Sequence, residues 1–261
     1  MIDGLALVTG AADRLGRAMA LKLADMGFDL VVHYGSSSEA AGETVKLIEA
    51  KGRKAVAVQA DLLDMDAVAA LVPEATKAMG QPLTVLINNA SIFEYDTLQS
   101  ATREGWDRHM GSNFQAPFLL TQAFARQAPA VAKDQNGEPI AQAAIINMID
   151  QRVRKLTPEF MTYTLAKMGL WALTQTSAQA LAPSIRVNAI GPGPTMQGIR
   201  QSDGHFARQR AATILERGSN PEDITAAMEY ILRSPALTGQ LICIDGGQHL
   251  GWRTADVLGV E

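Results

Sequence analysis

Three residues in the middle of the chain, Asp150, Tyr163 and Lys167, have the types and the spacing of an acid/base site. Tyr163 and Lys167 are four apart in a segment where Pro158 suits a helix start, so both side chains should project from one face. An ammonium beside a tyrosine hydroxyl favours the phenolate and brings the tyrosine pKa within range of acid/base work near neutrality. Asp150 follows the apolar run 143–147, so it should stand at a strand's carboxyl end, where open parallel sheets place their ligands. A chance pairing and a simple turn cap are the alternatives, and the surrounding elements decide between them.

The composition favours one α/β domain that acts on a small molecule. The 261 residues are 47% hydrophobic, which is enough to fill one sizeable core. A net charge of -4 without a long basic run argues against a nucleic-acid partner and an anionic membrane surface. Cys243 is the only cysteine, which excludes an internal disulfide and fits a reducing cytoplasm. We expect no metal, no signal peptide and no membrane span.

Short apolar runs alternate with amphipathic segments of helical length, and this alternation predicts a doubly wound parallel sheet with helices on both faces. The seven strand-like runs are 5–9, 29–33, 54–59, 83–87, 143–147, 185–190 and 241–244. Segment 132–142 is rich in Gly, Pro and charge and is expected to be a surface loop. Segment 192–218 is longer, polar and glycine-punctuated, and it follows a strand's carboxyl end, so it is a candidate substrate lid.

The turn after the first strand is typical of a dinucleotide site. Gly10 and Gly16 allow close backbone approach to a pyrophosphate, which the N-terminus of the next helix stabilises. Arg14 lies inside this turn, where a guanidinium can pair with a phosphate. An ordinary tight turn with a solvent-facing arginine is the alternative.

The end of the second strand indicates which dinucleotide is bound. A cofactor without a 2'-phosphate wants an acidic residue there, whereas residues 33–37 read His-Tyr-Gly-Ser-Ser and no carboxylate precedes Glu39. The pattern therefore favours NADPH over NADH, with Arg14, His33 and Ser36 near the 2'-phosphate. The alternative is that Ser36 or Ser37 only caps the following helix, and Ser37 is a candidate for that cap in either case.

With these pieces together, the chain resembles the short-chain dehydrogenase/reductase family over nearly its whole length. The matching motifs are Thr9-Gly-Ala-Ala-Asp-Arg-Leu-Gly16, Ala60-Asp61, Asn88-Asn-Ala90, Asn113, Tyr163-Thr-Leu-Ala-Lys167, Asn188, Pro192-Gly193 and Asp245-Gly246-Gly247.

The resemblance implies a role for each matching residue. Tyr163 would be the proton donor, Lys167 would bind the nicotinamide ribose and lower the tyrosine pKa, and Asn113 would hold a proton-relay water. Asp61 would contact the adenine, and Thr195 would lie near the carboxamide. The full set expected to bind the cofactor is Gly10, Arg14, Leu15, Gly16, His33, Tyr34, Ser36, Asp61, Leu62, Asn89, Ala90, Ser91, Tyr163, Lys167, Pro192, Gly193 and Thr195.

Two departures from the general family pattern narrow the resemblance. Arg14 stands at the family's middle glycine and Asp150 at its catalytic serine, as in the pteridine reductases and the bacterial dihydromonapterin reductases. Phe93 matches a ring that stacks on the pterin in those enzymes. The residues expected to bind the substrate are Ser91, Phe93, Asp150 and Tyr163.

The aspartate also has a physical reading of its own. A serine hydroxyl donates a hydrogen bond to a carbonyl oxygen that becomes an alkoxide, whereas an ionised Asp150 cannot and would oppose the developing charge. Reduction of a C=N bond needs a proton at nitrogen, which a carboxyl beside Tyr163 can help to supply.

The leading prediction is NADPH-dependent reduction of a dihydropterin such as dihydromonapterin, dihydrobiopterin or a dihydrofolate-like compound. The alternatives are a carbonyl reductase of the 3-oxoacyl or sugar type, and a non-catalytic NADPH-sensing module, which the presence of Asn113, Tyr163 and Lys167 disfavours.

The resemblance also implies a homotetramer, a dimer of dimers in which the helices around Asn113 and Tyr163 pack against a second subunit. The tail 248–261 would lie near a subunit boundary, so we expect Trp252 or Arg253 to help close a partner's active site. Packing of Trp252 on its own subunit is the alternative. The histidines His109, His205 and His249 lack metal-ligand spacing and are expected on the surface or in packing.

Overall fold

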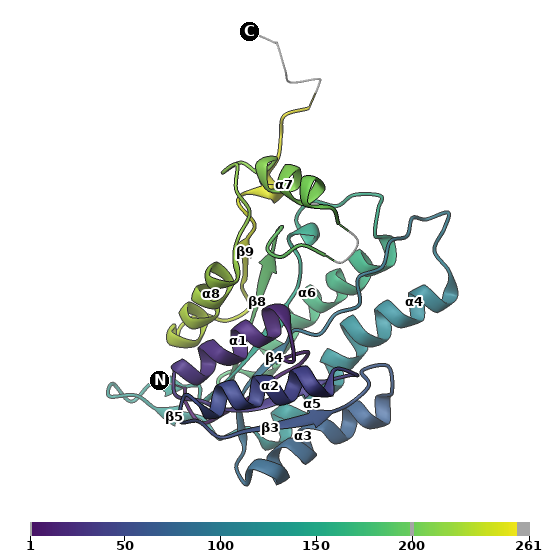
Figure 1. The fold of residues 1–261 in the computed structure, drawn as a ribbon. Coiled ribbons are helices and arrows are strands. Elements are labelled where there is room, and N and C mark those ends of the chain that lie inside the picture. Colours follow the sequence, from purple (N-terminus) through teal and green to yellow (C-terminus); the bar gives the residue numbers. More distant parts are fainter. Residues whose placement is uncertain (1, 199–200, 255–261) are drawn as a thin grey trace.

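The computed structural model describes residues 2–198 and 201–254, which are built around a seven-stranded sheet (Figure 1). The strand order is β3-β2-β1-β4-β7-β8-β9, and every pair is parallel. The strands are β1 (Leu5–Val8), β2 (Asp29–Tyr34), β3 (Ala55–Gln59), β4 (Leu83–Asn88), β7 (Ala143–Met148), β8 (Ile185–Pro192) and β9 (Leu241–Ile244). All seven predicted strands are confirmed. The order reverses between β1 and β4, which is where open sheets of this kind bind their ligands.

Helices cover both faces of the sheet, because strands β1, β4 and β7 are apolar along nearly their whole length and are buried on both sides. One apolar core joins the sheet to α1 (Arg14–Asp25), α2 (Ser38–Glu49) and α8 (Pro221–Arg233). A second core joins it to α3 (Met65–Met79), α5 (Ala116–Gln127) and α6 (Met161–Leu181). The predicted doubly wound α/β class is therefore confirmed.

The two irregular segments contain more structure than expected. The predicted loop at 132–142 contains a short antiparallel hairpin of β5 (Ala132–Lys133) and β6 (Pro139–Ile140). The carboxylate of Asp134 closes its turn by accepting hydrogen bonds from the backbone N–H groups of Asn136 and Glu138. Segment 192–218 contains the helix α7 (Asp203–Ala211), which lies near the end of the molecule that carries the C-terminal tail (Figure 1).

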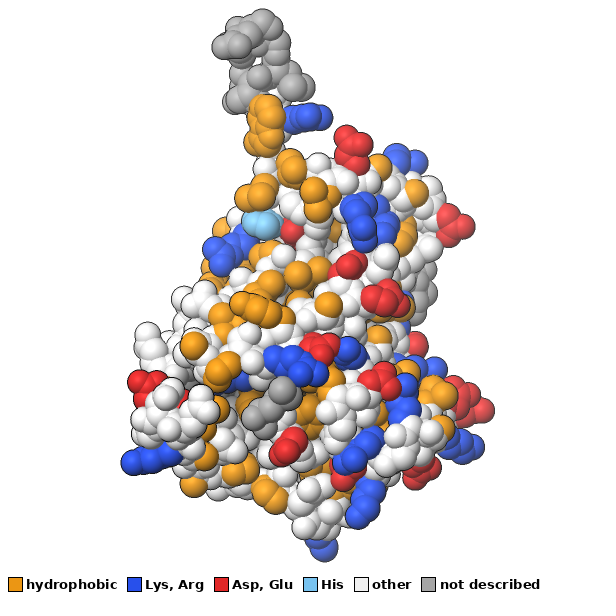
Figure 2. Space-filling view, turned by 90° about the vertical axis from the view of Figure 1, so that its left-hand side faces the viewer, with side chains coloured by type: hydrophobic (Ala, Val, Ile, Leu, Met, Phe, Trp, Pro, Cys, Tyr) orange, Lys and Arg blue, Asp and Glu red, His pale blue; other side chains and the backbone are white. Residues whose placement is uncertain are grey.

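Apolar side chains gather on the surface beside the tail (Figure 2). Beyond β9 the chain forms a short 3-10 turn, η3 (Gln248–Leu250), and continues to Trp252, whose side chain is 58% exposed. Leu250 and the lid residues Ile214 and Leu215 are exposed as well. The part of the tail predicted to approach a partner subunit includes residues 255–261, which lie outside the described residues.

Candidate active site

The centre of the site is where β7 ends and α6 begins. Beyond β7, Asp150 caps the short 3-10 turn η2 (Gln151–Val153), with its Oδ1 accepting from the Arg152 N–H at 2.8 Å. The Tyr163 hydroxyl, from the first turn of α6, donates to the other carboxylate oxygen, Oδ2, at 3.1 Å. Lys167, one turn later, donates from Nζ to the Met148 carbonyl at 2.8 Å. The helix and the strand thus bring together the three residues whose spacing indicated chemistry.

The electrostatics of this group differ from the expectation for the tyrosine. Burial raises the pKa of Tyr163 well above 10.0, and the negative charge and hydrogen bond of Asp150 raise it further. Lys167 Nζ donates to the Met148 carbonyl, and the Tyr163 hydroxyl donates to Asp150 and not to a group on Lys167. The tyrosine pKa is therefore raised in this arrangement and the hydroxyl keeps its proton, whereas the lowering of that pKa by Lys167 stays a prediction.

The other two ionisable groups shift in ways that follow from burial. Burial raises the pKa of the Asp150 carboxyl, although the Arg152 N–H and charge, the Tyr163 hydrogen bond and the charge of Lys167 oppose the rise. Burial lowers the pKa of Lys167 to about 8, against the opposing attraction of Asp150. The Asp150 carboxyl and the Tyr163 hydroxyl, joined by one hydrogen bond, therefore form a pair that holds a proton more tightly than either group does in water.

Asn113 lies in a π-helical turn, η1 (Gly111–Gln115), between α4 (Arg103–Met110) and α5. Turns of this type are frequent at functional sites because they re-aim side chains within a helix. The Asn113 amide accepts from the Ile92 N–H at 2.8 Å and donates to the Ile92 carbonyl at 2.8 Å. Its side chain therefore fixes the segment that carries Ser91 and Phe93. The water relay that the resemblance implies remains a prediction.

An aromatic wall, formed by Phe93, Tyr95 and Phe160, stands beside Tyr163. Phe93 and Phe160 stack with ring centres 4.4 Å apart and planes 6° apart, and Phe93 meets Tyr163 edge-on at 4.7 Å. Tyr95 packs edge-on against Phe160 at 5.2 Å, and the Arg152 guanidinium lies 4.7 Å from the Phe160 ring centre. Phe93 is 48% exposed, which leaves surface for a flat ligand.

No sequence motif marks Phe160 or Arg152, although both flank the catalytic candidates. Phe160 precedes the first helical residue of α6 and has φ of 55°, a left-handed conformation that is unusual for a bulky side chain. Strained residues of this kind concentrate at functional sites. The available sequence signal was position alone, since Phe160 stands three residues before Tyr163 and Arg152 stands two residues after Asp150.

The glycine turn has the shape of a phosphate cradle. Gly10 has φ of +63°, and a Cβ at Gly16 would overlap the Gly10 carbonyl oxygen, so the turn packs too closely for side chains at these positions. Asn89 closes the cradle from β4, donating from Nδ2 to the Thr9 carbonyl at 2.8 Å. Across the site a Cβ at Gly193 would approach the Asp245 Cα to 2.7 Å, so backbone also lines that side.

His33 does not present its ring to a phosphate. The side chain is 2% exposed, and its Nδ1 accepts from the Gly10 N–H at 3.0 Å, which leaves Nε2 to donate to the Ala60 carbonyl at 3.1 Å. Burial lowers the His33 pKa to about 4, so the ring is neutral. The expectation of His33 beside the 2'-phosphate needs correction for the side chain, since both ring nitrogens are engaged in holding the glycine turn.

The surface next to His33 keeps the features that a 2'-phosphate needs. Ser37 precedes α2 without making a side-chain capping hydrogen bond, contrary to its expected role, so the first N–H groups of α2 have no side-chain cap. Ser36 and Ser37 are exposed there, and β2 ends in Tyr34 without a carboxylate. Uncapped N–H groups at a helix start and nearby hydroxyls suit an anion.

Arg14 joins the glycine turn to the predicted lid. Its guanidinium donates to the carbonyls of Gln197 at 3.0 Å and Met196 at 3.3 Å, across the carboxyl edge of the sheet. Its backbone has φ of 53°, in the left-handed region that glycine occupies without strain. Arg14 therefore keeps the backbone shape of the glycine it replaces while adding a cation over the cradle.

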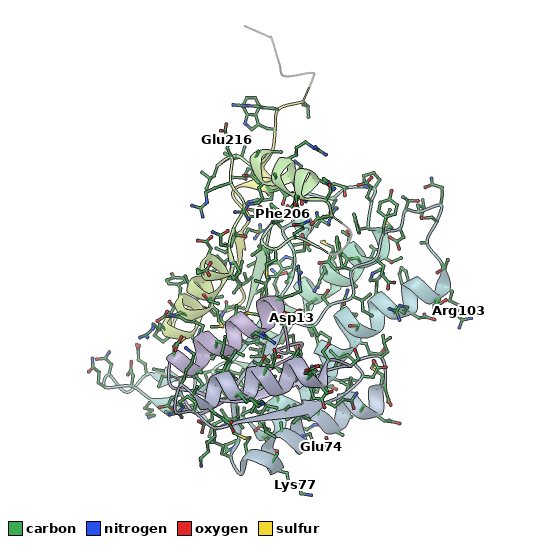
Figure 3. The ribbon with its side chains drawn as sticks, viewed as in Figure 1. Asp13, Glu74, Lys77, Arg103, Phe206 and Glu216 are labelled. Atoms are coloured by element: carbon green, nitrogen blue, oxygen red, sulfur yellow. The ribbon has the colours of Figure 1, made fainter. Side chains whose placement is uncertain are left out.

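The two ends of segment 192–218 are tied together. Arg210, from α7, donates to the carbonyls of Pro194 and Ser219 at 2.9 and 2.6 Å, and Thr195 and Ser219 hydroxyls lie 2.5 Å apart. Figure 3 shows Asp13, which caps α1, below α7 and its Phe206. The described parts of the segment, 192–198 and 201–218, are therefore anchored to each other beside the start of α1, and closure as a lid remains a prediction.

The remaining predicted cofactor residues lie at the same edge, because parallel strands end on one side of the sheet. Those after β3 and β4 are Asp61, Leu62, Ala90 and Ser91, and those at the end of β8 or just after it are Pro192, Gly193 and Thr195. Leu15 lies in the first turn of α1. The Asp61 carboxylate turns back to accept from the Leu63 N–H at 2.9 Å, which shapes the turn after β3.

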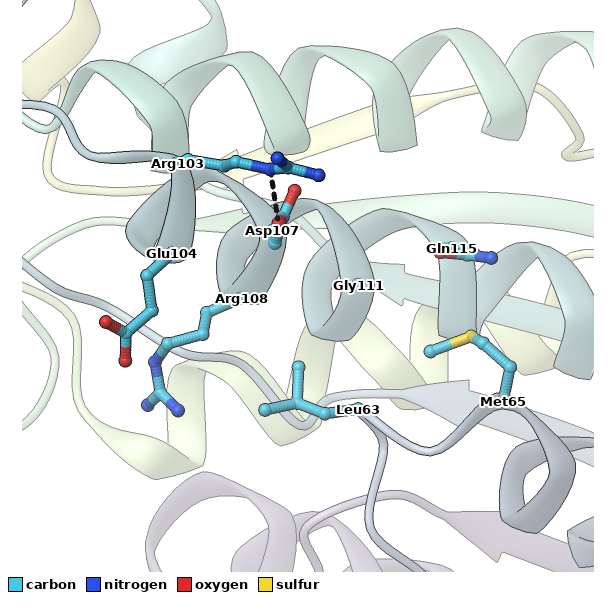
Figure 4. A pocket seen from close by; sticks show the side chains of 8 residues that line it. All are labelled: Leu63, Met65, Arg103, Glu104, Asp107, Arg108, Gly111 and Gln115. Carbon is cyan, nitrogen blue, oxygen red and sulfur yellow. Dashed lines mark ion pairs between the residues drawn. The ribbon is translucent and has the colours of Figure 1, made fainter.

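Two hollows lie outside this edge. One, of about 460 Å³, lies between the start of α3 and the outer face of α4, where Arg103 and Asp107 pair at 3.7 Å (Figure 4). The other, of about 400 Å³, is a mainly apolar groove between α5 and α6 that includes Phe118 and Leu173. Within the described part of the chain, no cluster of His, Cys, Asp and Glu could hold a metal ion, and no helix is long and apolar enough to cross a membrane.

Comparison with known proteins gives consistent matches. The family model described as short chain dehydrogenase matches residues 4–207. The crystal structure of FolM alternative dihydrofolate reductase 1 from Brucella suis in complex with NADP is 39% identical, has a TM-score of 0.89, and each chain covers 97% of the other. A short chain dehydrogenase from Burkholderia cenocepacia J2315, also in complex with NADP, is 31% identical with a TM-score of 0.83, covering 93% of this chain and 96% of that chain. The 3-oxoacyl-[acyl-carrier-protein] reductase FabG of Staphylococcus aureus (strain Mu50) is 30% identical, over 94% of this chain and 98% of the relative.

Proposed function

Because this chain belongs to the short-chain dehydrogenase/reductase family, we propose that it is an NADPH-dependent oxidoreductase that reduces a C=N bond of a dihydropterin. The observation that carries the proposal is the hydrogen bond from the Tyr163 hydroxyl to the Asp150 carboxylate at 3.1 Å. An aspartate in that position can hold and return a proton but, when ionised, cannot donate a hydrogen bond to a developing alkoxide.

The cofactor assignment rests on fit. The close-packed glycines, the uncapped start of α2 and the Arg14 guanidinium suit a dinucleotide with a 2'-phosphate, and both structural neighbours named above contain NADP. Lys167 keeps N–H donors beyond its bond to Met148 for the nicotinamide ribose. When bound, NADPH supplies the hydride that adds to the carbon of the C=N bond.

The protein's own part is to place the substrate and supply the proton. Phe93 offers a half-exposed ring for a flat heterocycle, next to Tyr163. The Tyr163 hydroxyl gives its proton to the substrate nitrogen, and Asp150, whose pKa is raised by burial, holds a proton that can restore it. The product is the corresponding amine, with one hydride at carbon and one proton at nitrogen.

A ketone substrate is the second candidate, favoured by the FabG relative. Following NADPH oxidation with a dihydropterin, dihydrofolate and a panel of ketones separates the readings. Turnover of the dihydropterin is expected. Turnover of ketones only would remove the proposal, and NADPH binding without any turnover would favour a sensor.

We also propose that the chain forms a homotetramer. Phe118 is exposed in the mainly apolar groove between α5 and α6, and a second copy packed there would bury it. The tail beyond Asp245 and its exposed Trp252 would then lie near a second boundary.

A further inference from the structure

The segment that carries Phe93 and Tyr95 of the aromatic wall is irregular and requires support from outside. Residues 89–102 connect β4 to α4 without forming a helix or a strand, yet they hold Phe93 within 4.7 Å of the Tyr163 ring. Asn113 fixes the beginning of this segment through Ile92. What fixes the part beyond Phe93 is a buried chain of three polar side chains, Asp96, Thr162 and His109.

Asp96 caps the helix that carries Tyr163. Phe160, at the start of α6, offers no side-chain cap, so the helix start depends on a group from elsewhere. The Asp96 carboxylate accepts from the Thr162 N–H at 3.2 Å, and the Asp96 carbonyl accepts from the Phe160 N–H at 2.8 Å. A carboxylate at a helix N-terminus is electrostatically favourable. One residue of the loop therefore holds both the helix start and the left-handed Phe160.

The chain of hydrogen bonds has one direction. His109 Nε2 accepts from the Glu94 N–H at 3.1 Å, so the ring proton is on Nδ1. Nδ1 lies 2.7 Å from the Thr162 hydroxyl and donates to it, and the hydroxyl in turn donates to Asp96 Oδ2. Asp96, Thr162 and His109 are 7%, 2% and 1% exposed. In such a buried chain, removing the central hydroxyl leaves a donor and an acceptor unsatisfied.

The hydrogen-bonded side chains of Asp96, Thr162 and His109 lie directly behind Tyr163. The His109 ring meets the Tyr163 ring edge-on, with centres 6.0 Å apart, and the loop, α4 and α6 meet at this point. His109 was expected on the surface or in simple packing, and no sequence motif marked Asp96 or Thr162. Their joint role follows from the fold, which brings residues 66 positions apart into contact.

We infer that Asp96, Thr162 and His109 are positioning residues that set where Phe93 and Phe160 hold the substrate ring relative to the Tyr163 hydroxyl. The identity of that ring rests on the proposed function, whereas the positioning does not. Because reacting groups must be held within a fraction of an ångström, loosening this chain changes substrate use more than it changes cofactor binding.

The test compares two threonines on one helix. Thr162→Val removes the central hydroxyl at nearly constant shape, and Thr162→Ser keeps it. Thr164→Val is the matched control, since the Thr164 hydroxyl is equally buried and meets no hydrogen-bond partner among the described residues. Below the melting temperature of every variant, Thr162→Val is expected to raise KM for the dihydropterin by about tenfold. NADPH affinity and the pH profile of kcat should stay as in the wild type, and Thr162→Ser and Thr164→Val should keep the wild-type KM.

The inference fails if Thr162→Val only lowers the melting temperature and leaves KM unchanged, since that result describes a helix cap alone. It also fails if Thr164→Val raises KM equally. Should the wild type turn over only ketones, the proposed function falls while the same KM comparison is made with the ketone. Should it reduce nothing, crystals of both valine variants decide: the 4.7 Å separation of Phe93 and Tyr163 should change only in Thr162→Val.

Discussion

The Tyr163 hydroxyl donates its hydrogen bond to Asp150, at 3.1 Å, and makes none to Lys167. A tyrosine that faces a carboxylate retains its proton, because ionising it would place two negative charges side by side. The pair is therefore suited to delivering a proton, which is what reduction of a C=N bond requires. The first two predictions below follow from this relationship.

Replacing Asp150 should exchange one substrate class for another. Asp150→Ser removes the carboxyl that stores a proton and supplies a neutral donor, so kcat/KM for a dihydropterin should fall by on the order of 10²-fold while ketone reduction rises. Asp150→Asn is the control of matched shape and should lose dihydropterin activity too. Steady-state NADPH oxidation measures both. Unchanged dihydropterin turnover in both variants would contradict the role of Asp150.

The pH profile should show the raised pKa of Asp150. Since burial raises this pKa above 3.8, the carboxyl keeps its proton to higher pH than a free one, and kcat/KM should fall as pH rises through the raised value. This fall of kcat/KM with rising pH should be absent in Asp150→Asn. If kcat/KM of that variant falls at the same pH as in the wild type, another group supplies the proton.

The lowered pKa of Lys167 should make the free energy of unfolding increase as the pH rises. Its pKa is lowered from 10.5 to about 8, so between these values the unfolded chain binds more protons than the folded one. Stability should therefore rise with pH across that window, and this part of the rise should be lost in Lys167→Met. Denaturant unfolding of wild type and variant at several pH values measures it, and equal slopes would contradict the lowered pKa.

Two variants of Arg14 should show that its side chain affects NADPH affinity and that its backbone conformation affects stability. Arg14→Gly relieves the left-handed backbone at φ of 53° and should stabilise the protein by about 1 kcal/mol, but it removes the cation above the cradle. We expect NADPH affinity to fall by about tenfold with little change for NADH. Arg14→Ala should lose the same affinity without gaining stability. Fluorescence titration with both cofactors decides, and an equal loss for NADH would argue against contact with the 2'-phosphate.

The tail should matter to substrate rather than to cofactor. A chain ending at Leu250 lacks the exposed Trp252 and Arg253, and it should remain folded and bind NADPH. If these residues close the site of a neighbouring subunit, substrate KM rises; unchanged kinetics would exclude that role. Closure of a neighbouring site by the tail requires that the protein assembles, so the state of assembly is measured as well. Phe118→Glu places a charge in the groove between α5 and α6, and Leu98→Glu is the control at an exposed position. Light scattering should show smaller particles only for Phe118→Glu.

By itself, the sequence determined what short-range physics controls. The alternation of apolar runs with amphipathic segments specified seven parallel strands, and Gly10 and Gly16 specified a close-packed turn, because strand burial, helix periodicity and glycine conformation depend on neighbouring residues. The four-residue spacing of Tyr163 and Lys167 likewise required only a helix.

Only the tertiary structure decided which groups face one another. It turned Tyr163 toward Asp150 instead of Lys167, buried His33 as a support for Gly10, and connected Asp96 to His109 through Thr162. Hydrogen-bond partners and pKa shifts depend on distances between segments that are remote in the chain and on the burial that the whole fold creates. No local pattern encodes these quantities, so the chemistry of the site is defined only in the folded protein, where the carboxyl ends of the strands lie together.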